Sequence, residues 1–162
     1  MIFRIGFGYD VHRLAEGESL WLGGIPVPHQ KGTVAHSDGD VLIHAICDAM
    51  LGAAKLRDIG YHFPDNSTDF KNIDSKVLLK KTNGLISEKG YTIGNIDATI
   101  AAQKPKLKDY IPMMEETLAE VLGVDFDAVS VKATTTEKLG FEGREEGISA
   151  YATVLIQKKN QA

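Results

Sequence analysis

An aspartate and a histidine, Asp10 and His12, stand two residues apart in a segment whose apolar and other side chains alternate strictly. Alternation over residues 3–12 predicts a β-strand with one apolar face. Asp10 and His12 then project from the same face with Cα atoms about 6.8 Å apart, so both side chains can reach one ion. Gly6 and Gly8 precede them on that face and leave room either for a ligand or for a closely packed backbone. The apolar face carries Phe3, Ile5, Phe7, Tyr9 and Val11.

Another histidine, His44, lies in the segment HSDGDVLIHAICDA, residues 36–49. The spacing of apolar residues predicts a helix that begins near Ser37 or Asp38 and runs to about Ala54. Two histidines and one carboxylate are a usual ligand set for catalytic zinc, which keeps a fourth position open. The competing interpretation of His44 is a partly buried helix histidine that binds no metal.

Three aspartates of the same segment have ordinary interpretations as well. Asp38 and Asp40 fall in the expected first helical turn, where acidic side chains complement the helix macrodipole. Asp48 lies one turn after His44, so it either orients that histidine through a hydrogen bond or occupies a solvated helix position. The sequence leaves both interpretations of Asp48 open.

The C-terminal half carries the polar cluster TTTEK, residues 134–138, after a predicted strand. In one interpretation, Thr134 and Glu137 have capping-box spacing, and the threonines suit a strand end. In the other, hydroxyl and backbone N–H groups form a phosphate site, and Glu137 supplies an oxygen ligand to magnesium or manganese. The segment AAQKPK, residues 101–106, is equally open between a ligand site and a strand end followed by a turn.

The order of the expected helices and strands, which must position these groups, predicts an α+β fold. We expect one domain over residues 1–162, with a polar tail at 158–162, built as a two-layer sandwich. Its sheet is mixed or antiparallel and is covered by helices on one face, and the apolar side of the first strand favours burial in an oligomer. After that strand we expect a hairpin of 20–22 and 25–27 turned at Gly23-Gly24, then the helix that ends near 54, and then a loop over 57–68. A second helix should run from its cap Asp74 to Gly90 and a third from Asp109 to Gly123. The remaining strands are expected over 91–103, 128–134 and 147–156.

Composition and charge limit the classes of partner that the protein can bind and indicate its cellular compartment. The chain has 162 residues and a net charge of −4, and no run of Lys and Arg exceeds two residues, which argues against nucleic acid as a partner. The apolar runs are too short to span a bilayer, and the N-terminus does not resemble a targeting peptide. Cys47 is the one cysteine, so we expect no intramolecular disulfide, a small apolar packing role for this residue, and a cytoplasmic protein.

Five segments, taken in order, closely resemble the 2-C-methyl-D-erythritol 2,4-cyclodiphosphate synthase family of the non-mevalonate isoprenoid pathway. Together they reach across the chain from Arg4 to Ile156, and five motifs in register are far more specific than any one of them. The segments are GFGYDVHRL, AHSDGDVLIHAICDAMLGAA, DIGYHFPD, KGYTIGNIDATIAAQKPKL and VKATTTEKLGFEGREEGI.

The resemblance implies a metal-dependent active site. Asp10, His12 and His44 would hold one zinc ion per subunit, and Glu137 would hold a second cation, magnesium or manganese. His36 would be catalytic together with Thr135. The loop over 58–65 would cover the methylerythritol group, and residues 102–107 would form the cytidine pocket. His36 and Ser37 would lie near the substrate phosphates, and Thr134, Thr135 and Glu137 would form the diphosphate and second-metal site. The implied substrate-binding residues are Asp10, His12, His36, Ser37, Asp58, Ile59, Gly60, Phe63, Pro64, Asp65, Ala102, Lys104, Pro105, Lys106, Leu107, Thr134, Thr135, Glu137, Phe141 and Arg144.

The implied reaction is an intramolecular phosphoryl transfer. It converts 4-diphosphocytidyl-2-C-methyl-D-erythritol 2-phosphate to 2-C-methyl-D-erythritol 2,4-cyclodiphosphate plus CMP, which makes the enzyme a phosphorus-oxygen lyase. The resemblance also implies a homotrimer, with sheets facing the three-fold axis and active sites between adjacent subunits. A trimeric metal- and nucleotide-binding module without turnover is the competing function, and a metal-dependent phosphohydrolase is the third.

Overall fold

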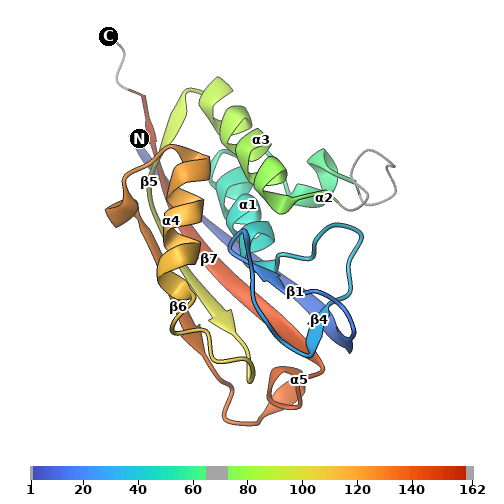
Figure 1. Cartoon of the computed structure of the whole chain (residues 1–162). Helices are drawn as coiled ribbons and strands as arrows, with labels where there is room; N and C mark the ends of the chain where they lie inside the picture. Colours follow the sequence, from blue (N-terminus) through green and yellow to red (C-terminus); the bar gives the residue numbers. More distant parts are fainter. Residues whose placement is uncertain (1, 65–72, 160–162) are drawn as a thin grey trace.

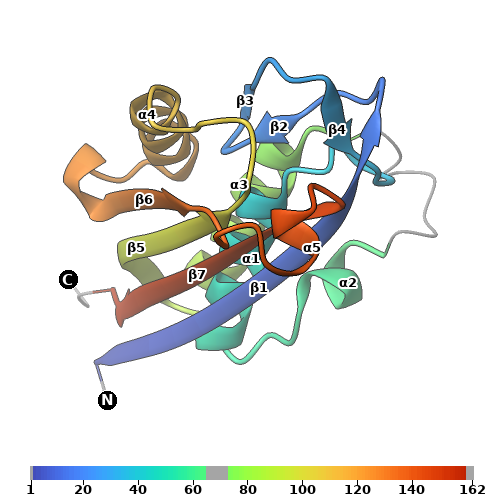
Figure 2. The same cartoon turned by 90° about the horizontal axis from the view of Figure 1, so that it is seen from below.

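A five-stranded sheet with the strand order β4-β1-β7-β5-β6 forms the centre of the protein. The structure is a computed structural model that describes residues 2–64 and 73–159. The long helices lie together on one face of the sheet, which is the two-layer α+β arrangement that the sequence predicts (Figures 1 and 2). Among the described residues, no helix is both long enough and apolar enough to cross a membrane.

The sheet is mixed. β1 (Phe3–Glu16) and β5 (Tyr91–Ala101) both pair antiparallel with β7 (Gly147–Lys158). β6 (Val129–Thr134) runs parallel to β5, and β4 (Lys31–Thr33) pairs antiparallel with the far end of β1. A helix connects β5 to β6, as a parallel pair requires, because a tight hairpin turn can join only antiparallel strands.

Three long helices cover the sheet: α1 (Val41–Ala53), α3 (Ser75–Glu88) and α4 (Ile111–Leu122). α1 is almost entirely buried because it packs on β1 and β7 on one side and on α3 on the other. The core is therefore centred on α1. The shorter elements are β2 (Trp21–Leu22) and β3 (Ile25–Pro26), which form the predicted hairpin, α2 (Ile59–His62), the 3-10 helix η2 (Phe126–Ala128) and α5 (Gly140–Gly143).

Gly6 and Gly8 let α1 approach the backbone of β1. A Cβ atom at Gly6 would lie 1.8 Å from the carbonyl oxygen of Ala49, and one at Gly8 would lie 1.9 Å from that of Ala45. Any side chain at either position would overlap the helix. Of the two interpretations of these glycines, the structure supports close backbone packing, and this packing sets the distance between β1 and α1.

The opposite face of β1 is apolar and exposed in the isolated chain. Ile5 and Phe7 are 70% and 65% exposed, and Tyr9 packs its ring 5.1 Å from that of Tyr151 on β7. Contiguous apolar surface of this kind is uncommon on a monomer and marks an interaction site. The sequence prediction of one apolar strand face is confirmed.

Several boundaries differ from the sequence prediction. α1 begins at Val41 rather than near Ser37 or Asp38, because Asp40 is its N-cap. α4 begins at Ile111 rather than at Asp109.

Two irregular segments are also more ordered than predicted. The expected loop over 57–68 contains α2, and β7 extends to Lys158, which lies in the expected polar tail. The N–H of Lys159 donates to the carbonyl of Gly90, which keeps this part of the tail beside the start of β5. The predicted caps of the second helix are confirmed, since Asp74 caps α3 and Gly90 follows it with φ 79°.

Candidate active site

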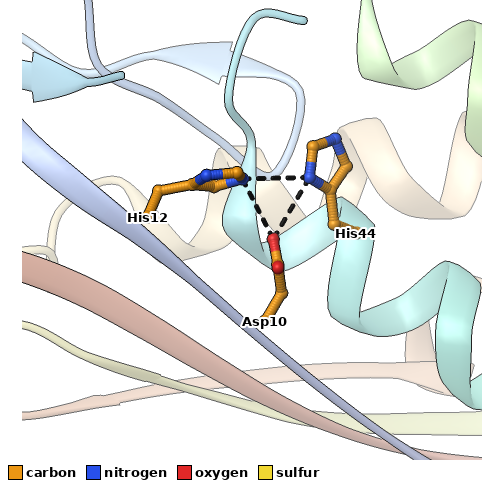
Figure 3. Close-up of side chains that lie close together, drawn as sticks. All are labelled: Asp10, His12 and His44. Atoms are coloured by element: carbon orange, nitrogen blue, oxygen red, sulfur yellow. Dashed lines mark hydrogen bonds and ion pairs between the residues drawn. The ribbon is translucent and has the colours of Figure 1, made fainter. Parts of the chain in front are cut away.

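Asp10, His12 and His44 point their side chains at one another (Figure 3). Oδ2 of Asp10 lies 3.0 Å from Nε2 of His12 and 3.1 Å from Nδ1 of His44. The two histidine nitrogens are 3.1 Å apart, so the three atoms form a nearly equilateral triangle. β1 supplies the first two residues from its helix-facing side, and α1 supplies the third (Figure 3).

The triangle has the chemistry of a cation site. A carboxylate oxygen and two imidazole nitrogens all offer lone pairs to the same small volume, which is unfavourable unless a proton or a metal ion lies between them. Tetrahedral zinc with bonds near 2.0–2.1 Å places its ligand atoms about 3.3 Å apart, close to the spacing seen here. The residues present therefore fit a divalent metal such as zinc.

The pKa values follow from the same contacts. Burial alone would raise the pKa of Asp10, but hydrogen bonds and positive charge from His12 and His44 outweigh burial and lower the pKa to about 2. Burial alone would lower the pKa of His44, yet its hydrogen bond and attraction to Asp10 outweigh burial and raise the pKa. Both shifts have the same origin: the ionised Asp10 carboxylate stabilises positive charge at this cluster, whether a proton or a cation carries it.

A cavity of about 420 Å³ opens beside the triangle. It is lined by several of the residues predicted to bind substrate, together with apolar side chains from the segment after β4, from α2 and from α3. Among the predicted phosphate contacts, Ser37 lies beside His44, with Oγ 3.4 Å from Nε2. The lining residues that the sequence predicts are His12, His36, Ser37, His44, Ile59, Gly60 and Phe63.

A second cavity, of about 390 Å³, lies where β5 and β6 end. This is the position of the predicted cytidine pocket and of the diphosphate threonines. Lys104 extends toward Glu145, with Nζ 3.4 Å from Oε1. The predicted residues that line the second cavity are Ala102, Pro105, Lys106, Leu107, Thr134 and Thr135.

The predicted site residues therefore fall into two groups. Of the residues that the structure describes, none that lines the first cavity also lines the second. β1 and β6 are three strand spacings apart, so the groups are separated by about 14 Å across the sheet.

The remaining predicted residues lie near these cavities or outside the described part of the chain. Glu137 is exposed in the turn after β6, Asp58 caps α2, and Phe141 and Arg144 lie in and after α5. Pro64 directly follows the α2 segment, whereas Asp65 is outside the described residues.

Two sequence interpretations are wrong. Asp48 does not orient His44; its Oδ1 accepts a 2.7 Å hydrogen bond from the N–H of Ile59 and so holds the start of α2. Thr134 and Glu137 form no capping box, because Glu137 and Lys138 have φ values of 54° and 65° and the next helix starts only at Gly140.

Two residues that contact the site were missed. Oγ of Ser75 lies 3.0 Å from Nε2 of His44, and the same hydroxyl donates to Asp38. Asp38 was interpreted as a macrodipole partner and Ser75 was not considered. No local pattern joins them, since 37 residues separate the two in the chain.

Comparisons with known proteins extend over nearly the whole chain. A protein of Bacteroides fragilis named 2-C-methyl-D-erythritol 2,4-cyclodiphosphate synthase is 69% identical over 158 residues, which are 98% of this chain and 99% of that protein. A protein of Porphyromonas gingivalis with the same name is 64% identical over 154 residues, 95% of each chain.

Solved structures agree in fold. IspF of Plasmodium falciparum in a CDP complex superposes with a TM-score of 0.85 at 37% identity, covering 98% of this chain and 97% of that one. The bifunctional IspDF of Campylobacter jejuni gives a TM-score of 0.94 at 44% identity; the match covers 97% of this chain but 42% of that longer one. Residues 3–157 match the model of the YgbB family, and together with these full-length relatives this shows that the chain belongs to the YgbB family.

Proposed function

We propose that the protein catalyses the reaction for which its relatives are named, the formation of 2-C-methyl-D-erythritol 2,4-cyclodiphosphate. The substrate is 4-diphosphocytidyl-2-C-methyl-D-erythritol 2-phosphate, and the second product is CMP. The observation that carries the proposal is the convergence of Asp10, His12 and His44 beside a cavity, in a chain 69% identical to a protein of that name. The reaction makes the protein a phosphorus-oxygen lyase.

Ring closure is an internal displacement. An oxygen of the 2-phosphate attacks the β-phosphorus of the diphosphate, a new P–O bond forms, and the bond between the β-phosphorus and the CMP oxygen breaks. The nucleophile is already an anion and CMP leaves as one, so no side chain has to remove a proton. The demands on the protein are to hold two phosphates in line and to offset their charge.

The residues of the first cavity suit both of these tasks. Asp10, His12 and His44 would hold zinc, which when bound supplies Lewis-acid polarisation of a phosphate oxygen. His36 is exposed at the cavity and offers a ring N–H to a phosphate oxygen. Ser37, one residue on, positions its hydroxyl in the same cavity and would add a second hydrogen bond.

The second cavity would hold the nucleotide and its diphosphate. The Thr135 hydroxyl accepts a 3.3 Å hydrogen bond from the N–H of Glu137 and keeps its own proton to donate to a phosphate oxygen. Glu137 would hold the second divalent cation, magnesium or manganese. The segment over 102–107 would enclose the cytidine.

We further propose a homotrimer with each active site between adjacent subunits. The two groups of site residues are about 14 Å apart across one sheet, so a compact substrate is better enclosed by one group from each of two chains. The exposed apolar face of β1 supplies the surface that such an assembly would bury toward its axis. The single buried thiol, Cys47, suits the reducing cytoplasm, where we propose that the enzyme acts.

The test is incubation of the protein with the substrate, zinc and magnesium, followed by phosphorus NMR. Cyclisation predicts equal amounts of CMP and cyclic diphosphate. A binding module without turnover predicts unchanged substrate. A phosphohydrolase predicts linear products that carry oxygen-18 from labelled water, whereas ring closure incorporates none.

A further inference from the structure

His44 makes contacts through both ring nitrogens. Nδ1 belongs to the triangle with Asp10 and His12, and Nε2 lies 3.0 Å from Oγ of Ser75. Ser75 is the first residue of α3 and is completely buried. Its hydroxyl lies in turn 2.5 Å from Oδ1 of Asp38. A continuous line of polar atoms thus runs from the candidate metal site, through His44 and Ser75, to a carboxylate.

The donors along this line can be assigned from chemistry. An ionised carboxylate only accepts hydrogen bonds, so the hydroxyl proton of Ser75 must be directed at Asp38. The hydroxyl oxygen is then left as an acceptor toward His44, and Nε2 must carry the ring proton. With the proton on Nε2, the lone pair of a neutral ring is on Nδ1, where a metal ion can take it. Without a metal, the Asp10 carboxylate 3.1 Å away favours a second proton on Nδ1.

Asp38 is itself held in place. Its Oδ2 accepts a 2.8 Å hydrogen bond from the N–H of Ser75, and its Oδ1 accepts a 3.2 Å hydrogen bond from the N–H of Asp40. Its own N–H donates to the carbonyl of Ile73. The carboxylate is therefore fixed by two chain segments, one leading into α1 and one leading into α3.

We propose that Asp38 and Ser75 are positioning residues, which fix the Nε2–H tautomer and the ring orientation of His44 so that Nδ1 faces the metal. The inference rests on the proposed metal site but not on turnover. The other hydroxyl near Nε2 belongs to Ser37 and is farther away, at 3.4 Å, so Ser75 is the principal acceptor. Hydrogen-bond partners of this kind typically contribute 10–100-fold to metal affinity.

The first experiment measures zinc dissociation constants by competition with a chelator. Ser75→Ala removes the acceptor while its backbone N–H still reaches Asp38, and we expect zinc affinity to fall at least tenfold. Ser75→Thr restores a hydroxyl and should recover most of the affinity. Ser149→Ala is the matched control, because Ser149 is another completely buried serine whose hydroxyl donates to a carboxylate, that of Glu142 at 2.8 Å. It should bind zinc as the unchanged protein does.

The second experiment observes the ring proton of His44 directly. Nitrogen-15 NMR of the zinc-loaded protein should show one ring proton on His44, at Nε2, that exchanges slowly with solvent because it donates to buried Ser75. In Ser75→Ala the same proton should exchange faster. Zinc affinity within twofold of the unchanged protein in Ser75→Ala, an equal loss in Ser149→Ala, or equally slow exchange of the Nε2 proton in Ser75→Ala and the unchanged protein would each overturn the proposal. Both readouts are independent of CMP release, so an inactive protein that passes these tests would refute the proposed function alone.

Discussion

Asp40 accepts a 2.7 Å hydrogen bond from the backbone N–H of Gly24, and this bond ties the start of α1 to the turn of the β2–β3 hairpin. Its other oxygen accepts 3.0 Å bonds from the N–H groups of Gly23 and Ile43. The side chain is fully buried, and although burial raises its pKa, three backbone donors depend on it. Asp40 therefore joins two parts of the fold as well as capping a helix.

We expect Asp40→Ala to destabilise the protein by about 3 kcal/mol or more, because three buried N–H groups lose their acceptor at once. Asp40→Asn keeps one acceptor oxygen and should lose about half as much. Chemical denaturation of the metal-free proteins measures both. Equal stability of Asp40→Ala and the unchanged protein would show that water replaces the carboxylate.

The second prediction concerns the metal. His44→Ala removes one corner of the triangle, and zinc content measured by atomic absorption should fall severely while the oligomeric state is unchanged. His29→Ala, which changes a histidine outside the triangle, is the control and should keep its zinc. Full zinc content in His44→Ala would remove this residue from the site.

The second cation should be separable from the first. Glu137 is exposed and outside the triangle, so Glu137→Gln should shift the magnesium or manganese concentration needed for half-maximal activity at least tenfold upward. Zinc content in the same variant should stay the same. Parallel loss of both metals would mean that the two sites are one.

We predict that the exposed apolar face of β1 is the interface of the proposed trimer. Ile5→Lys places a charge on an apolar surface that the trimer would bury, and light scattering should then report monomers. Val77→Lys makes the same change at an exposed valine on α3, on the helical side, and should leave the trimer intact. A trimer in both variants would mean that β1 is not the interface.

Ionisation of the Cys47 thiol should make the stability of the folded protein depend on pH. Burial raises the pKa of this thiol to about 12 from an unfolded value near 9. Because the folded pKa is raised, the thiol's contribution to stability is complete below pH 9. It is lost as pH rises toward 12, at about 1.4 kcal/mol per pH unit. Comparison of urea unfolding of Cys47→Ala and the unchanged protein between pH 8 and 11 isolates this slope.

The same thiol should be slow to react. A thiol reagent added to the native protein should modify Cys47 only after denaturant is added, since the side chain is completely buried and protonated at neutral pH. Rapid modification at pH 7 would show that α1 opens readily.

What the sequence could predict was local. Alternation predicted β1 and its apolar face, and Asp74 and Gly90 marked both ends of α3, because these signals depend on neighbours along the chain. The start of α1 was misplaced because Asp40 is fixed by Gly23 and Gly24, which no helix pattern contains.

In the candidate site, too, the local features could be predicted from the sequence and the tertiary contacts could not. The pairing of Asp10 with His12 followed from a period of two, whereas their meeting with His44 depended on the packing of α1 on β1. Asp38 and Ser75 were missed because only tertiary structure brings them together. The left-handed backbone at Glu137 has no sequence signal either, since glycine or asparagine usually occupies such positions.

The bare backbones of Gly6 and Gly8 beneath α1 leave no clearance between strand and helix. Asp10 and His44 could move apart only if α1 separated from the sheet, and that would disrupt most of the packing in the hydrophobic core. The packing of α1 on β1 therefore holds the three candidate metal ligands at a fixed separation.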